Sequence, residues 1–231
     1  MSKFDFSLGK QLAVLIDPDK ADRGFLDDVI RCSEAKVNLF LVGGSMLRED
    51  NFEKTIVYLK EHSNIPVYVF PGNMLQVSPK ADGILLLSLI SGRNPEFLIG
   101  HHVLAAPAIK RANIDVLPTG YLLLDGGNVT SVEYMSNTKP IPANKSDIVV
   151  ATALAGQQLG MKAIYLEAGS GAKNKVRTEI IKNVKQNIDI PIIVGGGISS
   201  VYDVNQAFDA GANMVVIGTA IENDPNILEN F

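Results

Sequence analysis

Short apolar runs alternate with longer amphipathic segments along the chain, and this alternation constrains the fold more than any other feature. Eight strand positions can be distinguished, and most are apolar at consecutive residues, as strands buried on both faces should be. They are residues 12–16, 37–42, 67–70, 83–87, 114–117 continued by 121–124, 163–166, 190–194 and 214–217. Repeated strand–helix units imply a parallel sheet, and eight strands predict a closed (β/α)8 TIM barrel. The alternative is an open doubly wound sheet.

Two segments depart from the regular alternation of predicted strands and helices. Between Phe70 and Gly83 the chain contains Pro71, Gly72 and Pro79, which leaves too little proline-free sequence for an ordinary crossover helix. The third helix is therefore predicted to be missing or replaced by an extended segment. The connection 125–146 is long, which is typical of a functional loop or lid. Helices are predicted at 22–36, 51–62, 95–111, 146–160, 175–187 and 201–210.

Composition limits the classes of function. With 231 residues, 46% of them hydrophobic, the chain can bury a large core, and residues 1–231 are predicted to form one domain. The net charge of -4 does not favour nucleic acid or an anionic membrane surface as a partner. No apolar stretch is long enough for a signal peptide or a transmembrane helix. The single cysteine, Cys32, cannot form an internal disulfide, so a cytoplasmic location is expected.

Two strands near the C-terminus end in glycine, in the stretches "PIIVGGGISS" and "NMVVIGTAI". In TIM barrels the loops after strands seven and eight often bind phosphate through backbone amides. Glycine lets the phosphate approach the backbone because it has no Cβ. Either loop alone is equally well a tight turn, but the two together favour a phosphate site.

Polar side chains follow the first and second strands. Asp17 and Asp19 lie in "LIDPDK", and Ser45 follows two glycines in "VGGSML". Strands one, two, seven and eight are neighbours in a barrel, so Asp17 and Ser45 can face the same mouth as the glycine loops. A carboxylate and a hydroxyl with open water positions suit Mg²⁺. The competing interpretation is helix capping, by Asp17 or Asp19 before the first helix and by Ser45 before the second.

At this point seven stretches together resemble the geranylgeranylglyceryl phosphate synthase family, in particular its second group from archaea and some bacteria. They are "LIDPDK", "LVGGSM", "LPTGYLLLDGG", "SNTKPIP", "YLEAGSGA", "VGGGI" and "AGANMVVIGTAIE", and the match runs from about residue 12 to residue 222. The resemblance implies a modified barrel whose third helix is replaced. It also implies transfer of a geranylgeranyl group from geranylgeranyl diphosphate to sn-glycerol 1-phosphate. A homo-oligomer, a dimer or larger, is common among such proteins.

The family's site residues carry over by position. Asp17 and Ser45 fall on the Mg²⁺ positions. The glycerol-phosphate segment corresponds to Tyr165, Leu166, Glu167, Ala168, Gly169, Ser170 and Gly171. The further phosphate contacts correspond to Gly196, Gly197, Gly218 and Thr219, although many relatives have Gly-Asn at the last pair. Relatives that transfer a heptaprenyl group have a lysine two residues before the metal aspartate; Leu15 stands there in this chain and favours geranylgeranyl.

Glu167 is the candidate base that removes the proton of the glycerol 3-hydroxyl, because it stands at a strand tip next to the small-residue loop. A carboxylate that caps a helix near Lys173 is the competing interpretation. Tyr165 either orients the glycerol hydroxyls or packs in the core. Mg²⁺ near Asp17 would neutralise the diphosphate leaving group.

A prenyl chain needs an apolar groove. Candidate lining residues are Leu86, Leu87, Tyr121, Leu123 and the segment "EYMSNTKPIP", although each could belong to the ordinary core. His101 and His102 are adjacent on a helix and point in different directions, which favours a helix surface or a subunit contact over a metal site. Lys139 either meets the diphosphate or lies in solvent.

Two other classes of function share the phosphate loops. One is an oxidoreductase that uses flavin mononucleotide, which would make the protein yellow. The other is a non-catalytic protein that binds a phosphate ligand, for which a carboxylate at position 167 has no role. The combination of a base, a metal site and phosphate loops on one barrel rim favours the prenyltransferase.

Overall fold

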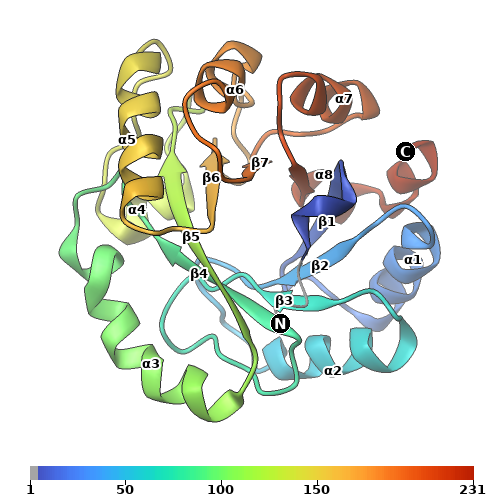
Figure 1. Cartoon of the computed structure of the whole chain (residues 1–231). Coiled ribbons are helices and arrows are strands. Elements are labelled where there is room, and N and C mark those ends of the chain that lie inside the picture. The colour runs from blue at the N-terminus through green and yellow to red at the C-terminus, as the bar shows by residue number, and fades with distance from the viewer. Residues whose placement is uncertain (1–4) are drawn as a thin grey trace.

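A computed structural model describes residues 5–231 and has the predicted architecture (Figure 1). Eight parallel strands pair in chain order and close into a barrel. The strands are β1 (Gln11–Ile16), β2 (Leu39–Val42), β3 (Val67–Val69), β4 (Gly83–Ser88), β5 (Asp115–Leu123), β6 (Ala163–Glu167), β7 (Ile192–Gly195) and β8 (Met214–Ile217). The pairing of β1 with β8 completes the closure, so the doubly wound alternative is wrong.

Helices surround the barrel, and most lie where the sequence predicts them (Figure 1). They are α1 (Arg23–Ser33), α2 (Phe52–His62), α3 (His101–Ala112), α4 (Ser131–Ser136), α5 (Ser146–Gln158), α6 (Thr178–Lys185), α7 (Val201–Asp209) and α8 (Thr219–Asn223). A π-helical turn, η2 (Glu96–Gly100), precedes α3, and 3-10 turns form η1 (Phe6–Leu8) and η3 (Pro225–Asn230). None of the helices in the described part of the chain is long and apolar enough to cross a membrane.

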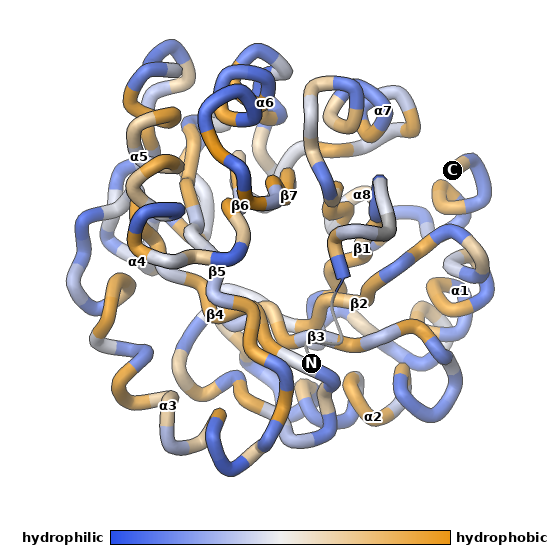
Figure 2. The backbone as a smooth tube through the Cα atoms, in the orientation of Figure 1, coloured by the Kyte–Doolittle hydropathy of each residue, from blue (hydrophilic) through white to orange (hydrophobic). Residues whose placement is uncertain are grey.

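Most strand residues are hydrophobic at consecutive positions (Figure 2), because both faces of the strands are buried. In β1, Val14 and Ile16 pack in the layer between the sheet and the helices, whereas Ala13 packs inside the barrel. In β6, Tyr165 faces the interior and Leu166 faces the helices. The strand period of two therefore decides which side chains can reach the barrel mouth.

The segment between β3 and β4 contains no helix, as its prolines predict. The buried side chain of Gln76 connects this segment to the loop after β2. Its Nε2 donates to the Gly44 carbonyl at 2.7 Å, and its Oε1 accepts from the Gly72 amide at 3.2 Å. The loop after β2 and the helix-free segment are thereby joined at the rim of the barrel.

Strand β5 joins the two apolar runs predicted for this position, 114–117 and 121–124, into one continuous strand. The residues between the runs also belong to the strand, and Pro118 pairs with Leu86. Proline lacks only the amide donor, and the Pro118 carbonyl still accepts from the Lys162 amide at 2.8 Å.

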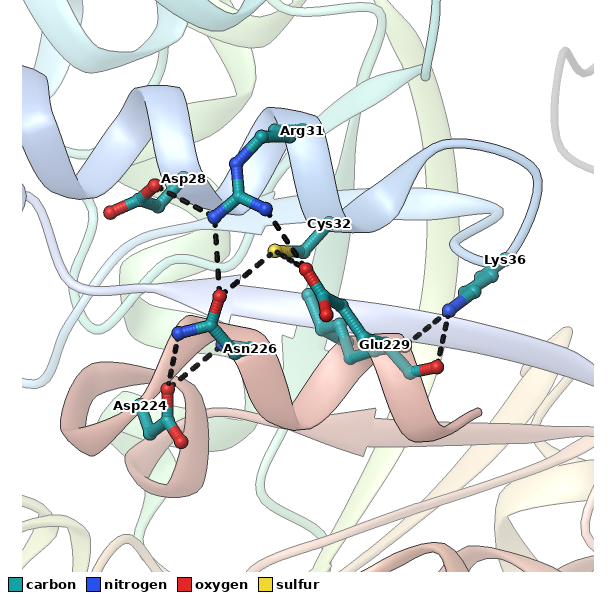
Figure 3. A network of polar contacts seen from close by, with 8 residues as sticks. Asp28, Arg31, Cys32, Lys36, Asp224, Asn226 and Glu229 are labelled. Atoms are coloured by element: carbon teal, nitrogen blue, oxygen red, sulfur yellow. Dashed lines mark hydrogen bonds and ion pairs between the residues drawn. The ribbon is translucent and has the colours of Figure 1, made fainter.

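A polar network attaches η3 to α1 (Figure 3). The Arg31 guanidinium donates to Glu229 Oε1 at 2.9 Å and to Asn226 Oδ1 at 3.2 Å. The Lys36 ammonium donates to the carbonyls of Leu228 and Glu229, at 3.0 and 2.7 Å. Beneath this network the Leu228 side chain is completely buried. Because η3 follows α8 directly, this attachment fixes the segment that follows the last strand.

Truncation of Leu228 tests this anchor. Leu228→Ala should lower the free energy of unfolding by about 2–5 kcal/mol, because it leaves a cavity in the core. Denaturant unfolding followed by circular dichroism measures the loss. The matched control is Leu159→Ala, a side chain that is 73% exposed, which should cost less than about 0.5 kcal/mol. Equal losses for the two variants would show that the C-terminal segment does not stabilise the barrel.

Candidate active site

A cavity of about 850 Å³ opens at the carboxyl ends of the strands. Loops after β1, β2, β5, β6, β7 and β8 contribute to its wall, so segments far apart in the sequence meet there. Among its lining residues are Asp17, Ser45, Glu167, Gly196 and Gly218. This is the end of a (β/α)8 barrel at which active sites are built.

Glu167 is the last residue of β6, and only 6% of its surface is exposed. Its side chain faces the cavity. The Gly169 amide donates to Oε1 at 2.6 Å, so the chain turns back onto the carboxylate directly after the strand. Glu167 does not cap a helix, because α6 begins at Thr178 with Arg177 at its N-cap. The capping alternative for Glu167 is therefore wrong.

Burial gives this carboxyl group unusual acid–base properties. Removal from water raises the pKa of Glu167 from its ordinary 4.5 to about 7, while the Gly169 amide and the Tyr165 hydroxyl limit the rise. A carboxylate with a pKa near 7 is a stronger base than an exposed one and is still substantially ionised at neutral pH.

Tyr165 packs in the core of the barrel. Its ring is completely buried and stacks on Tyr121 at a centroid distance of 5.3 Å, with Phe70 at 5.4 Å. The packing interpretation is thus confirmed, and the hydroxyl still lies at the cavity wall next to Glu167. All three aromatic residues line the cavity.

Gly196 is required both by its conformation and by its surroundings. Its φ of +80° lies in the left-handed region, which side-chain-bearing residues rarely adopt. A Cβ at this position would overlap Glu167 Oε1 and the amides of Ala168 and Gly169. The glycine thus lets the β7 loop pass directly over the carboxylate.

The structure brings together most of the residues that were predicted to bind glycerol phosphate. Eight of them line the cavity: Tyr165, Glu167, Ser170, Gly171, Gly196, Gly197, Gly218 and Thr219. The Ser170 and Thr219 hydroxyl oxygens lie 3.3 Å apart, so the β6 and β8 loops touch.

Three predicted residues lie outside the cavity lining. The Leu166 side chain faces the helices, because it alternates with Tyr165 and Glu167 along β6. The amides of Ala168 and Gly169 already donate, to the Gly195 carbonyl and to Glu167. These residues shape the loop, whereas Ser170 and Gly171 present it to the cavity.

Asp17 and Ser45 both line the cavity, as predicted. Neither caps a helix: Asp22 caps α1 by accepting from the Phe25 amide, and the N-cap of α2 is Asn51. Asp19 instead accepts from the Arg48 and Glu49 amides, which fixes the loop after β2. The capping alternative is wrong for Asp17, Asp19 and Ser45.

Oxygen ligands of this kind fit Mg²⁺. Within residues 5–231 no three His, Cys, Asp or Glu side chains gather into a complete metal site. A carboxylate and a hydroxyl at an open cavity leave coordination positions for water and phosphate oxygens, which is the usual mode of Mg²⁺ binding.

Lys20 and Glu222 also line the cavity, although sequence reasoning assigned them no role. The Lys20 ammonium lies 2.7 Å from Glu222 Oε2 and 3.7 Å from Asp17 Oδ2. The position of Lys20 three residues after Asp17 could have indicated that it lies at the site. Its partner Glu222 is far away in the sequence and could not be inferred in this way.

An apolar groove joins the mouth between the helix-free segment, α3 and α4. Phe70, Tyr121, Val132 and Met135 line both the groove and the cavity and so form their junction. Farther along, the groove is lined by residues that include Leu86, Leu87, Ala105 and Ile109. The predicted lining is confirmed for Leu86, Leu87, Tyr121, Met135 and Ser136; Leu123 is instead buried in the barrel interior.

Both histidines belong to this groove, which differs from the predicted helix surface. His102 Nε2 lies 3.2 Å from Ser88 Oγ, and burial lowers the pKa of His102. Lys139 is exposed and lies outside the linings of the groove and the cavity, in agreement with the solvent alternative.

A sequence-family comparison identifies the lineage. The model of the PcrB family matches residues 8–231. The chain belongs to the PcrB family. The resemblance drawn from the motifs is therefore confirmed over nearly the whole sequence.

Similar proteins agree with this family membership. The chain is 46% identical to a geranylgeranylglyceryl phosphate synthase of Spirosoma linguale, over 95% of this chain and 88% of that protein. It is 40% identical to the synthase of Pyrococcus furiosus, over 94% and 86%. A crystal structure of (S)-3-O-geranylgeranylglyceryl phosphate synthase from Thermoplasma acidophilum, in complex with its substrate sn-glycerol-1-phosphate, matches with a TM-score of 0.91 and 33% identity, covering 97% of this chain and 91% of that chain.

The geometry at Gly196 can be tested against another glycine. Gly196→Ala should lower the free energy of unfolding by more than about 2 kcal/mol, since strain at positive φ adds to the overlap with Glu167. Gly160→Ala is the control, because Gly160 has a φ of +89° but nothing within 4 Å of its added Cβ. That variant should lose only about 1–2 kcal/mol, the cost of the backbone conformation. Similar losses in denaturant unfolding would contradict the close approach.

Proposed function

We propose that this PcrB-family protein transfers a geranylgeranyl group from geranylgeranyl diphosphate to the 3-hydroxyl of sn-glycerol 1-phosphate. The products are geranylgeranylglyceryl phosphate and diphosphate. The observation that carries the proposal is the buried Glu167 carboxylate beside the glycine loops of β6, β7 and β8. The names of the relatives and the ligand of the Thermoplasma acidophilum structure support it.

The acceptor is proposed to bind with its phosphate between the β6, β7 and β8 loops. The lining residues there are small: Ser170, Gly171, Gly196, Gly197, Gly218 and Thr219. Such loops bind phosphate through backbone amides and hydroxyls, and their lack of side-chain bulk permits close contact. This arrangement leaves the glycerol hydroxyls directed toward Glu167.

The donor is proposed to bind across the junction of the cavity and the groove. Its apolar chain fits the groove lined by Leu86, Leu87 and Ile109, where burial of hydrocarbon is favourable. Its diphosphate then lies in the polar cavity near Asp17 and Ser45. The reacting carbon is thereby placed between the two regions, next to Phe70 and Tyr121.

Asp17 and Ser45 are the residues that would hold Mg²⁺. When bound, the ion would neutralise charge on the leaving diphosphate.

The chain's own groups account for the remaining chemistry. The bond between the allylic carbon and the diphosphate oxygen breaks, and its electron pair leaves with diphosphate. The faces of Phe70 and Tyr121 can stabilise the positive charge that develops on the prenyl carbon. The glycerol 3-oxygen attacks this carbon, and its proton passes to Glu167. Glu167 accepts the proton readily because its pKa is about 7.

An activity assay tests the proposed function. Purified protein with Mg²⁺, sn-glycerol 1-phosphate and geranylgeranyl diphosphate should form the ether lipid phosphate, and EDTA should abolish the reaction. Glu167→Gln should lower kcat roughly 10²–10⁴-fold, because the amide cannot accept the proton. Product formation is followed by chromatography of radiolabelled lipid.

The controls separate loss of the base from loss of the fold. Glu61→Gln makes the same chemical change at an exposed position of α2 and should retain full activity. Folded wild-type protein that forms no product with prenyl diphosphates of several lengths would overturn the proposal. Full activity of Glu167→Gln would overturn only the assignment of Glu167 as the base and would leave the proposed function standing. Assembly into a homo-oligomer and a cytoplasmic location stay predictions.

A further inference from the structure

We propose that Lys20 binds the diphosphate group of the prenyl donor and that Glu222 holds its side chain beside the metal-binding carboxylate. This inference rests on the proposed function and assigns a residue to the leaving group. The Lys20 side chain would supply positive charge to the cavity in addition to that of the metal ion.

The geometry places Lys20 between two carboxylates. Its ammonium is 2.7 Å from Glu222 Oε2 and 3.7 Å from Asp17 Oδ2. The Glu222 side chain is 15% exposed, whereas that of Lys20 is 52% exposed. Glu222 is therefore the fixed partner, and the end of the lysine remains accessible to a ligand in the cavity.

The charged residues that line the cavity single out Lys20. Three carboxylates line it: Asp17, Glu167 and Glu222. Of the Lys and Arg side chains in residues 5–231, Lys20 and Lys173 line it. Lys173 follows β6, on the acceptor loop, and Lys20 follows β1, next to Asp17. Lys20 is thus the protein's own cation where a diphosphate would bind together with Mg²⁺.

Lys20 brings a positive charge to this side of the cavity, 2.7 Å from Glu222 Oε2, and its half-exposed side chain leaves the ammonium accessible to a ligand. A protonated ammonium donates charge-assisted hydrogen bonds, which are stronger than neutral ones. It would stabilise the electron pair that diphosphate takes with it when the bond to the allylic carbon breaks.

The same position gives Lys20 opposite effects on two ligands. Before diphosphate binds, the ammonium competes with a metal ion for Asp17, because both are attracted to one carboxylate. After diphosphate binds, the ammonium contacts the ligand and supports its binding. Removal of the charge should therefore strengthen metal binding and weaken diphosphate binding.

Titration calorimetry with inorganic pyrophosphate as the probe tests the assignment. At saturating Mg²⁺, Lys20→Met should weaken pyrophosphate binding roughly ten- to hundredfold, the range for loss of a hydrogen bond to a charged group. Without pyrophosphate, Mn²⁺ binding measured by electron paramagnetic resonance should become tighter. Affinity for sn-glycerol 1-phosphate should not change.

Three variants complete the design. Lys20→Arg keeps the charge and should restore most of the pyrophosphate affinity. Glu222→Gln removes the fixed partner and should weaken pyrophosphate binding less than Lys20→Met does, while raising the KM for the donor more than it lowers kcat. Lys10→Met is the matched control, because Lys10 forms its exposed ion pair with Asp209 and does not line the cavity.

The outcomes distinguish this inference from the proposed function. If wild-type protein turns over donor and acceptor but Lys20→Met binds pyrophosphate as wild type does, the assignment of Lys20 is overturned and the function stands. If Lys20→Met weakens metal and pyrophosphate binding equally, the lysine supports only the fold of the site, and the assignment is again overturned. If wild-type protein neither binds pyrophosphate with Mg²⁺ nor turns over, the proposed function itself fails.

Discussion

Removal of the Glu167 carboxyl group from water is the constraint around which the barrel mouth is arranged. A buried carboxylate without hydrogen-bond partners would be very unfavourable, so the chain turns directly after β6 and directs the Gly169 amide to it. The β7 loop closes over the same oxygen, which only glycine at position 196 permits. The small residues of both loops therefore serve the carboxylate as well as the proposed phosphate site. The remaining cost of burial raises the pKa of Glu167, which suits it to the proposed role of base.

The absence of a helix between β3 and β4 has a functional consequence. In its place the segment 70–82 runs along the rim, held to the β2 loop by Gln76. An apolar groove lies between this segment, α3 and α4, and it ends at the polar cavity. A substrate with an apolar chain and an anionic head can therefore bind across Phe70 and Tyr121, with its two parts in different surroundings. A change of the fold thus supports the chemistry proposed for this PcrB-family protein.

The sequence predicted the barrel, the missing helix and most of the residues that meet at the mouth. These features follow from local rules: consecutive apolar residues for two-sided burial, prolines that exclude a helix, and glycines and polar residues at strand ends. The family motif covers residues 165–171 as one block and does not show which of them face the cavity. Leu166 alternates away from the site, and the amides of Ala168 and Gly169 are used within the loop. The partnership of Lys20 with Glu222 and the inward direction of His102 depend on tertiary packing, which no short motif encodes.

The acid–base behaviour of Glu167 is the central claim, and its pKa can be measured directly. Carbon-13 NMR of protein labelled at the glutamate carboxyl carbons follows each carboxyl group with pH, and Glu167→Gln identifies the signal by its loss. Because burial disfavours the charged form, the group should stay protonated below its folded-state pKa and ionise with a midpoint of about 7. A midpoint near the ordinary value of 4.5 would contradict the account, because Glu167 would then be a solvated carboxylate and a weak base.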